Sequence, residues 1–314
     1  MLTLRPAEKP TFYFIGVTTG SSSIMKVFPK WAKALGIDAE IRGIDLPPHA
    51  PDAEYRAAAE FLKNDPLSLG ALVTTHKLDL FRACRDLFDY VDPYAERLQE
   101  VSSLSKSKPG GAFCAHAKDP ISSGLALEAF VPPQFWAEHG GEALLIGAGG
   151  SALAMSLYFA QEKFGANAPR RITIANRSAQ RLESAQKALA GLASGRIEFR
   201  FIHGPAAADN DRLIAALPPY SLVVNATGLG KDAPGSPTTD AVEYPSDSLV
   251  WEINYRGDLI FMDQALAQKD RKRLHVEDGW TYFIHGWTQV IAEVFHIGID
   301  ADMIGALSRI AEKT

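Results

Sequence analysis

The stretch GALVTTHK, residues 70–77, places a lysine directly after a short apolar run, where the next helix should begin. A lysine is mildly unfavourable there, because the N-terminus of a helix carries a partial positive charge. Thr74 and Thr75 could cap the helix without it. Lys77 is therefore either a solvated residue or one kept for chemistry at the carboxyl end of a strand. A lysine whose pKa is lowered by burial or by its neighbours can move a proton.

Asp119, in the segment AHAKDPISSG, is the second candidate for chemistry. A carboxylate close to a catalytic lysine would hold both the lysine and a substrate hydroxyl in place. However, Asp followed by Pro120 is also typical of a helix N-cap with proline at the first helical position. Both interpretations of Asp119 stay open on this residue alone.

The stretch LLIGAGGSALA, residues 144–154, contains the clearest motif of the chain. Gly147, Gly149 and Ala152 match G-x-G-x-x-G/A between an apolar strand and a helix, which is the context of dinucleotide binding. Gly147 permits the tight turn, Gly149 lets the backbone approach a pyrophosphate, and Ala152 lets helix and strand pack closely. Phosphate oxygens would accept from N–H groups at the helix N-terminus, which includes Gly150 and Ser151. The alternative is a purely structural glycine turn.

The end of the next predicted strand, RITIANRS at residues 171–178, selects between the two nicotinamide dinucleotides. NAD-binding folds usually place an acid there, whereas an arginine nearby can hold the 2′-phosphate of NADP. Here the chain has Asn176, Arg177 and Ser178. The guanidinium of Arg177 presents a planar fork of donors that suits a phosphate, so NADP is favoured and NAD stays possible. Ser178 is in addition a typical N-cap for the helix that follows.

Alternating strands and helices must position these residues. The predicted strands lie at residues 11–17, 39–46, 70–75, 143–147, 171–176, 197–202, 221–227 and 249–255, and most are followed by a helical pattern. Such alternation predicts an α/β protein with mainly parallel sheets and ligands at the carboxyl ends of the strands. Pro29 should kink or divide the helix at 23–36, which Gly36 should end.

A polar, glycine-bearing segment at residues 105–120 separates the two series of strands and is interpreted as a domain junction. We therefore expect a substrate domain of residues 1–122 and a dinucleotide-binding Rossmann domain of residues 123–278. Two amphipathic helices after residue 279 should return to pack on the first domain, which then also includes residues 279–314.

Composition and charge exclude several classes of protein. The chain has 314 residues, 46% of them hydrophobic and 22% charged, which is typical of a globular protein of about two domains. A net charge of -5 argues against a nucleic-acid partner. The uncharged segment 143–160 is broken by glycines, which argues against a membrane span. The two cysteines, Cys84 and Cys114, lack metal or redox spacing, and no His/Asp/Glu cluster has the spacing of a metal site. We expect a cytoplasmic protein that acts on a small molecule as a monomer or homodimer.

The order of these elements and motifs resembles the shikimate/quinate dehydrogenase family over nearly the whole chain. The resemblance implies an NADP-dependent dehydrogenase in which Lys77 is the acid/base and Asp119 its partner. It implies substrate contacts from Ser21 and Ser23, whose hydroxyls would bind a carboxylate. The remaining residues that it implies for the substrate are Thr74, Ser102, Tyr255 and Gln289. In VVNATGLG, the resemblance places Asn225, Ala226 and Thr227 against the cofactor.

The chain also departs from the family pattern. Leu72 and Ser102 stand where the family has asparagines that hydrogen-bond the ring hydroxyls of the substrate, and Pro120 replaces a glycine. Loss of a hydrogen-bonding amide should reduce discrimination for a hydroxyl-rich ring. The retained residues describe a pocket for a hydroxylated, carboxylated small ring, in a divergent member of the family.

Two alternatives stay open. One is a dehydrogenase of another cyclitol or polyol, which the departures at Leu72 and Ser102 suggest. The other is a non-catalytic sensor that binds cofactor or ligand, although a sensor has no need of both Lys77 and Asp119. Two further residues are interpreted from position: His76 as structural rather than catalytic, and Tyr282 as a pocket residue on the helical face of Gln289.

Overall fold

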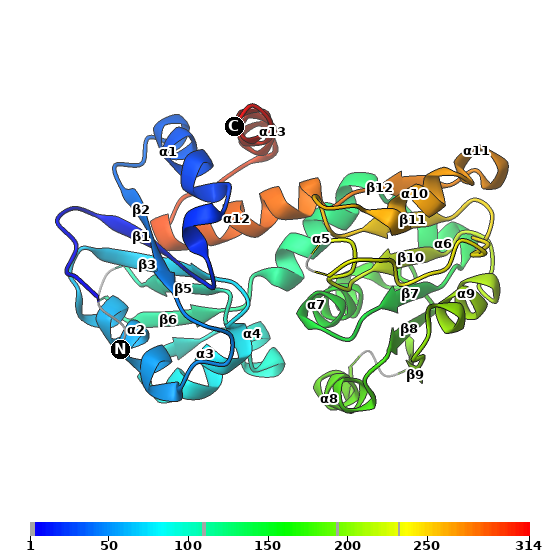
Figure 1. Ribbon diagram of the computed structural model, residues 1–314, viewed down its shortest axis with the longest axis horizontal. Helices are drawn as coiled ribbons and strands as arrows, with labels where there is room; N and C mark the ends of the chain where they lie inside the picture. Colours follow the sequence, from blue (N-terminus) through cyan, green and yellow to red (C-terminus); the bar gives the residue numbers. More distant parts are fainter. Residues whose placement is uncertain (1–3, 109–110, 193–194, 232) are drawn as a thin grey trace. The chain divides into compact units, whose positions relative to one another are not determined.

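The computed structural model describes residues 4–108, 111–192, 195–231 and 233–314 and has the predicted α/β fold, with two separate six-stranded sheets (Figure 1). The chain divides into two compact units. The first unit is Met1–Lys118 with Ile284–Thr314, and the second unit is Asp119–Phe283. In the described part of the chain, no helix has the length and apolar character needed to cross a membrane.

The sheet of the first unit is mainly parallel. Its strands, in pairing order, are β2 (Glu40–Asp45), β1 (Thr11–Gly16), β3 (Ser68–Val73), β5 (Ser103–Lys106), β6 (Phe113–His116) and β4 (Tyr90–Val91). Only β5 runs antiparallel to its neighbours. The helices between the strands are α1 (Ile24–Leu35), α2 (Asp52–Asn64), α3 (Lys77–Cys84) and α4 (Pro93–Leu98), with single 3₁₀ turns η1 (Thr19–Ser21) and η2 (Arg85–Leu87). All six residues of β1 are buried, so this strand lies at the centre of the core.

Helix α1 ends at Gly36 as predicted, with the glycine in the left-handed conformation at φ 67°. The prediction that Pro29 divides this helix is wrong, because α1 continues through it. Proline removes only one backbone hydrogen bond of the helix. Burial of the apolar face, which includes Phe28 and Trp31, holds the helix together across that gap.

The segment expected to be a domain junction is folded for most of its length. Ser103–Lys106 and Phe113–His116 form the antiparallel pair β5 and β6, in which Leu104 lies opposite Ala115. The chain passes into the second unit only at its end, between Lys118 and Asp119. Each strand has only four residues, and β5 is SLSK, so neither strand presents the longer apolar or alternating run that reveals a strand in sequence.

The sheet of the second unit is entirely parallel. Its strands, in pairing order, are β12 (His275–Glu277), β11 (Leu249–Glu252), β10 (Leu222–Asn225), β7 (Ala143–Ile146), β8 (Arg171–Asn176) and β9 (Glu198–His203). The helices are α5 (Asp119–Phe130), α6 (Phe135–His139), α7 (Gly150–Phe159), η3 (Glu162–Phe164), α8 (Ala179–Leu189), α9 (Ala207–Ala215), α10 (Ile260–Leu266) and α11 (Lys269–Lys272). The strand order reverses between β7 and β10. In a doubly wound sheet, the crevice for a ligand lies at that reversal, outside the carboxyl ends of the strands.

The C-terminal helices α12 (Trp280–Phe295) and α13 (Ala301–Glu312) return to the first unit as predicted, and Figure 1 shows α13 beside α1. The indole ring of Trp287 packs edge-on against Phe14, with ring centroids 5.1 Å apart. The indole N–H of Trp31 donates to the carbonyl of Leu307 at 2.8 Å, which fixes α13. The division between the two units falls within α12, after its first turn.

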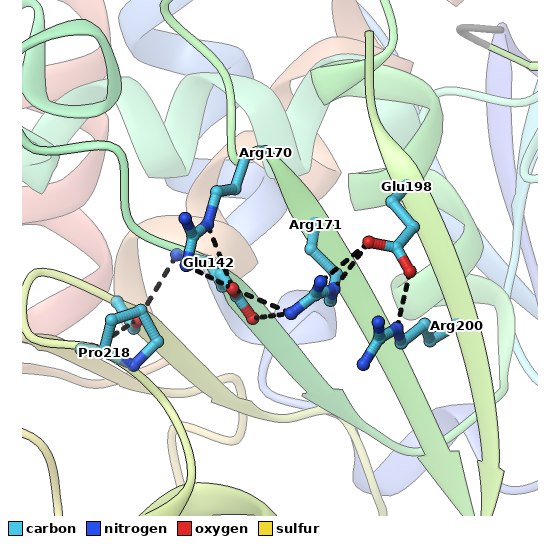
Figure 2. A network of polar contacts seen from close by, with 7 residues as sticks. Glu142, Arg170, Arg171, Glu198, Arg200 and Pro218 are labelled. Carbon is cyan, nitrogen blue, oxygen red and sulfur yellow. Dashed lines mark hydrogen bonds and ion pairs between the residues drawn. The ribbon is translucent and has the colours of Figure 1, made fainter. Parts of the chain in front are cut away.

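The amino ends of β7, β8 and β9 are joined by a network of ion pairs (Figure 2). The carboxylate of Glu142 is 5% exposed and accepts from Arg170 Nε at 3.0 Å and from Arg171 Nη1 at 2.9 Å. Arg171 also pairs with Glu198, which Arg200 contacts in turn. This network closes the edge of the sheet that lies away from the crevice.

Candidate active site

The glycine motif forms the turn between β7 and α7. Gly147 has φ 114°, and a Cβ there would lie 2.5 Å from the carbonyl oxygen of Ala226, so only glycine fits. Gly149 is the N-cap residue of α7, and the space around its missing Cβ is open to 4 Å. The turn therefore leaves room for a ligand to approach the backbone where the N–H groups of Gly150, Ser151 and Ala152 begin the helix.

A pocket of about 390 Å³ lies at the carboxyl ends of β7, β8 and β10, where the strand order reverses. Six of the predicted cofactor residues line it, namely Gly147, Gly149, Asn176, Arg177, Ala226 and Thr227. Ala152 is fully buried in α7, in keeping with its predicted packing role. Ser178 caps α8, because its hydroxyl accepts from the backbone N–H of Arg181 at 3.3 Å.

Arg181 also lines this pocket, and the sequence reasoning missed it. It lies in the first turn of α8, which begins directly after the N-cap Ser178, and an arginine at the start of the helix that follows Arg177 was the available signal. Among the described residues, the lining holds two arginines and no carboxylate. The pocket is therefore electropositive and suits a ligand that carries phosphate groups.

Asn225, a further predicted cofactor residue, is fully buried behind the pocket. Its Oδ1 accepts from the backbone N–H of Thr227 at 3.0 Å and from the Thr227 hydroxyl at 2.6 Å. In this arrangement Asn225 supports the loop that lines the pocket. Tyr282 lies near the same site, because its hydroxyl is 3.4 Å from the hydroxyl of Ser151.

Lys77 is the first residue of α3, directly beyond the carboxyl end of β3. Thr75 between them has φ 58°, a left-handed conformation that is strained for a β-branched residue. His76 is buried, and its Nδ1 lies 3.0 Å from the hydroxyl of Tyr55. This contact agrees with the interpretation of His76 as a structural residue, and it anchors the turn that carries Lys77.

Several predicted substrate residues meet at the same edge of the first sheet. Ser21 follows β1 and Thr74 follows β3, and these strands are parallel neighbours. Ser102 precedes β5, which runs antiparallel to β3, so Ser102 reaches the same edge. Ser23 lies directly before α1, and Gln289 is half-buried in the part of α12 that belongs to the first unit.

Asp119 and Tyr255 belong to the second unit. Asp119 begins α5, with Pro120 in the first turn, where a proline is tolerated. Tyr255 follows β11, and its ring centroid is 4.4 Å from that of Phe283. The partnership of Lys77 and Asp119 stays a prediction.

No protein-family model matches this chain. It is 28% identical over 295 residues to a shikimate dehydrogenase (NADP(+)) of Methylobacterium radiotolerans, and the match covers 88% of each chain. The chain is thus a distant relative of a curated shikimate dehydrogenase. A quinate dehydrogenase from Corynebacterium glutamicum, solved in complex with NAD, has the same fold at a TM-score of 0.72 and 18% identity, over 98% of this chain and 99% of that one. A 5-ketofructose reductase of Gluconobacter also has it, at a TM-score of 0.69 and 15% identity, over 98% and 99%.

The departures from this family have structural counterparts. Leu72 is 5% exposed, lies next to the last residue of β3 and is buried with the core. Ser102 is also buried, and its hydroxyl accepts from the backbone N–H of Lys118 at 2.7 Å. The hydroxyl of Ser102 thus holds the chain directly before Asp119.

Charged groups that the sequence reasoning did not use surround this point. Lys118 Nζ pairs with Glu293 Oε2 at 2.5 Å, and His116 Nε2 lies 3.3 Å from Glu293 Oε1. Burial acts to raise the pKa of Glu293, but the hydrogen bond from Lys118 and the nearby His116 outweigh it, so this pKa is lowered. Because Glu293 lies one turn after Gln289 on α12, the ion pair ties that helix to the end of β6. The available signal was a lysine next to Asp119 in sequence.

Both cysteines are free and buried, as expected. Burial raises the pKa of the Cys84 thiol to about 12, so this thiol is not a nucleophile at neutral pH.

Proposed function

We propose that this protein is an NADP-dependent oxidoreductase of the shikimate dehydrogenase type. It would transfer a hydride between nicotinamide and a secondary ring alcohol of a shikimate- or quinate-like hydroxylated acid. The observation that carries this proposal is the arginine-bearing pocket at the glycine turn of β7 and α7, in a chain related to a shikimate dehydrogenase (NADP(+)). NADP supplies the hydride acceptor when it is bound.

The residues of the second unit fit this cofactor. The backbone at Gly147 and Gly149 leaves space for a pyrophosphate, whose oxygens would accept from the N–H groups of Gly150, Ser151 and Ala152. Arg177 and Arg181 would hold the 2′-phosphate, which distinguishes NADP from NAD. Ala226 and Thr227 would form the wall of the pocket next to Gly147.

The residues that would handle the substrate come mainly from the first unit. Lys77 Nζ would take the hydroxyl proton as the alcohol is oxidised and return it in the reverse direction, with Asp119 orienting it. The hydroxyls of Ser21 and Ser23 would bind the substrate carboxylate. The substrate ring would be held by the other predicted residues, Thr74, Ser102, Tyr255 and Gln289. These assignments rest on the correspondence with the family and on the edge that several of these residues share.

The domain roles follow from this proposal. Residues 1–122 with 279–314 would form the substrate domain, and residues 123–278 the NADP-binding domain. We propose a cytoplasmic enzyme that is a monomer or a homodimer and acts on a small molecule.

A second candidate is a dehydrogenase of another cyclitol or polyol. The observation that favours it is the pair of departures at Leu72 and Ser102, one buried in the core and the other engaged with the backbone of Lys118. The 5-ketofructose reductase fold is in keeping with such a substrate. The non-catalytic sensor is less well supported, because both Lys77 and Asp119 are retained.

The test is a turnover assay that follows the absorbance of reduced nicotinamide, with NADP or NAD and with shikimate, quinate and a panel of cyclitols and polyols. We expect turnover with NADP and shikimate or quinate. Turnover only with another polyol would select the second candidate. Cofactor binding without turnover on any substrate would select the sensor.

The Lys77→Ala variant tests the proton-transfer role. We expect kcat to fall about 10²- to 10⁴-fold, because general acid–base catalysis contributes on that order. NADPH binding should be unchanged. The matched control is Lys33→Ala, an exposed lysine on α1 that should leave both unchanged. Turnover that survives in Lys77→Ala would contradict the role of this lysine.

A further inference from the structure

A buried carboxyl group lies behind the cofactor pocket. Glu252 is the last residue of β11 and is 0% exposed. Its Oε2 accepts from Asn225 Nδ2 at 2.6 Å. Its Oε1 accepts from the backbone N–H of Asn254 at 2.9 Å and from Asn254 Nδ2 at 2.6 Å. Three N–H groups therefore donate to one carboxyl group, an arrangement that suits the ionised form.

The orientation of Asn225 connects this carboxylate to the pocket. Because the backbone N–H of Thr227 can only donate, Asn225 must present Oδ1 to Thr227 and therefore Nδ2 to Glu252. Asn254 makes a second connection, since its Nδ2 also lies 3.2 Å from the carbonyl of Thr227. Ala226, Thr227, Gly228 and Leu229 line the pocket. The position of this loop thus depends on the hydrogen bonds of Glu252.

The ionised form of Glu252 is costly at this place. Burial raises its pKa to about 7, against the opposing effect of the hydrogen bonds from Asn254 and Asn225 and of the positive charge of Lys231. Burial and, to a smaller extent, the charges of Asp211 and Glu252 raise the pKa of the Tyr244 phenol further above its ordinary value, so Tyr244 stays uncharged near neutral pH. Glu252 can therefore gain or lose a proton close to neutral pH.

We propose that Glu252 is a positioning residue of the cofactor site, whose ionised form holds the Ala226–Leu229 loop in the conformation that binds the dinucleotide. This role rests on the proposed NADP site. A proton on the carboxyl group introduces an O–H donor that faces the amide of Asn225. If Asn225 turns to accept from it, its NH₂ group faces the N–H of Thr227, and the loop loses its anchor. Protonation of Glu252 then weakens cofactor binding.

The test measures the dissociation constants of NADPH and NADH by nucleotide fluorescence on the full chain, between about pH 6 and pH 8. If the affinity is proportional to the fraction of Glu252 that is ionised, Kd should rise about tenfold from pH 8 to pH 6. NADH is needed as well as NADPH, because a phosphate monoester itself titrates near pH 6. If Kd changes with pH in the same way for NADPH and NADH, the group that titrates belongs to the protein and not to the nucleotide.

Variants then assign the trend to one residue. Glu252→Gln cannot ionise, so its Kd should stay at the weak value and be independent of pH. Glu252→Asp keeps an ionisable group and should restore part of the pH dependence. The matched control is Glu142→Gln, a buried carboxyl group of the same unit at the opposite ends of the strands, which should keep the wild-type trend.

A measurement on the wild type alone covers the case in which Glu252→Gln does not fold. Calorimetry of NADH binding at pH 7 in two buffers of different ionisation enthalpy should show release of about half a proton. Zero release, a wild-type NADH Kd that is constant with pH, or an unchanged trend in Glu252→Gln would overturn this role and leave the proposed enzyme standing. Failure to bind either nucleotide at any pH would instead contradict the proposed function itself.

Discussion

Glu142 and Glu252 are two buried glutamates of one parallel sheet, and they lie at opposite ends of its strands. Glu142 precedes β7 at the amino ends and accepts from two guanidinium groups (Figure 2). Glu252 ends β11 at the carboxyl ends, and its hydrogen-bond partners in the described part of the chain are amide N–H groups. The carboxylate of Glu142 is paired with guanidinium groups, whereas the carboxylate of Glu252 accepts from neutral amide groups and the charge of Lys231 offsets its burial only in part. A buried carboxylate whose described hydrogen-bond donors are neutral is expensive, and here it lies behind the pocket.

The comparison extends to both units of the molecule. In a parallel sheet the carboxyl ends of the strands face the ligand, so residues there serve binding while residues at the amino ends serve stability. In the first unit, the strained Thr75 and the candidate Lys77 also follow the carboxyl end of a strand. Costly features of both units thus lie at the edges predicted to bind ligands.

The largest expected effect concerns Glu142, at the amino ends of the strands. Glu142→Ala should lower the free energy of unfolding by about 4 kcal/mol, because it removes the carboxylate that Arg170 and Arg171 share. Denaturant unfolding with and without NADPH measures the change. The NADPH Kd of the folded variant should be unchanged. If Glu142→Ala instead bound NADPH more weakly but kept the stability of the wild type, the amino ends of the strands would serve binding, and the distinction between the two ends would be wrong.

The second prediction concerns the pH dependence of stability. The folded pKa of Glu252 is about 7, above the usual value of a glutamate, so the native chain keeps a proton that the unfolded chain loses between about pH 4.5 and pH 7. Stability must therefore fall as pH rises through that window. The free energy of unfolding of the wild type, relative to Glu252→Gln, should fall by about 3 kcal/mol from pH 5 to pH 8. A flat or rising difference in denaturant titrations would mean that Glu252 is ionised throughout.

The smallest expected effect concerns Arg181, which lines the pocket at the carboxyl ends of the strands. Arg181→Ala should raise the Kd of NADP about tenfold, or ~1.4 kcal/mol, with little change for NAD, because one charge-assisted contact to the 2′-phosphate is lost. Fluorescence titration measures both constants. The control is Arg200→Ala, an arginine of the network at the amino ends, which should leave both affinities unchanged. Equal loss for NADP and NAD would place Arg181 away from the 2′-phosphate.

Sequence reasoning located most of the secondary structure and the lining of the cofactor pocket, because those signals are local. The glycine turn, the strands rich in valine and isoleucine and the capping residue Ser178 are each recognisable within a few residues. The strands β5 and β6 were not predicted, because four residues are too few to show a pattern and their place in the sheet depends on pairing with other strands. Arg181 and the Lys118–Glu293 pair were also missed. Only the folded chain shows that Arg181 lines the pocket and that Lys118 contacts Glu293.

The sequence by itself determined that a strand-to-helix turn lies at Gly147, because the glycine spacing directly after an apolar strand is a local signal. It also determined the parallel α/β class and an arginine after the second strand of the Rossmann unit. Only the tertiary structure decided which glutamate pairs with arginines and which accepts from neutral amide groups. Both are ordinary glutamates in sequence, but Glu142 meets arginines 28 and 29 residues away and Glu252 meets an asparagine 27 residues away. The charge state of a buried carboxyl group is set by the partners and the desolvation that folding imposes, and neither exists until the strands pair.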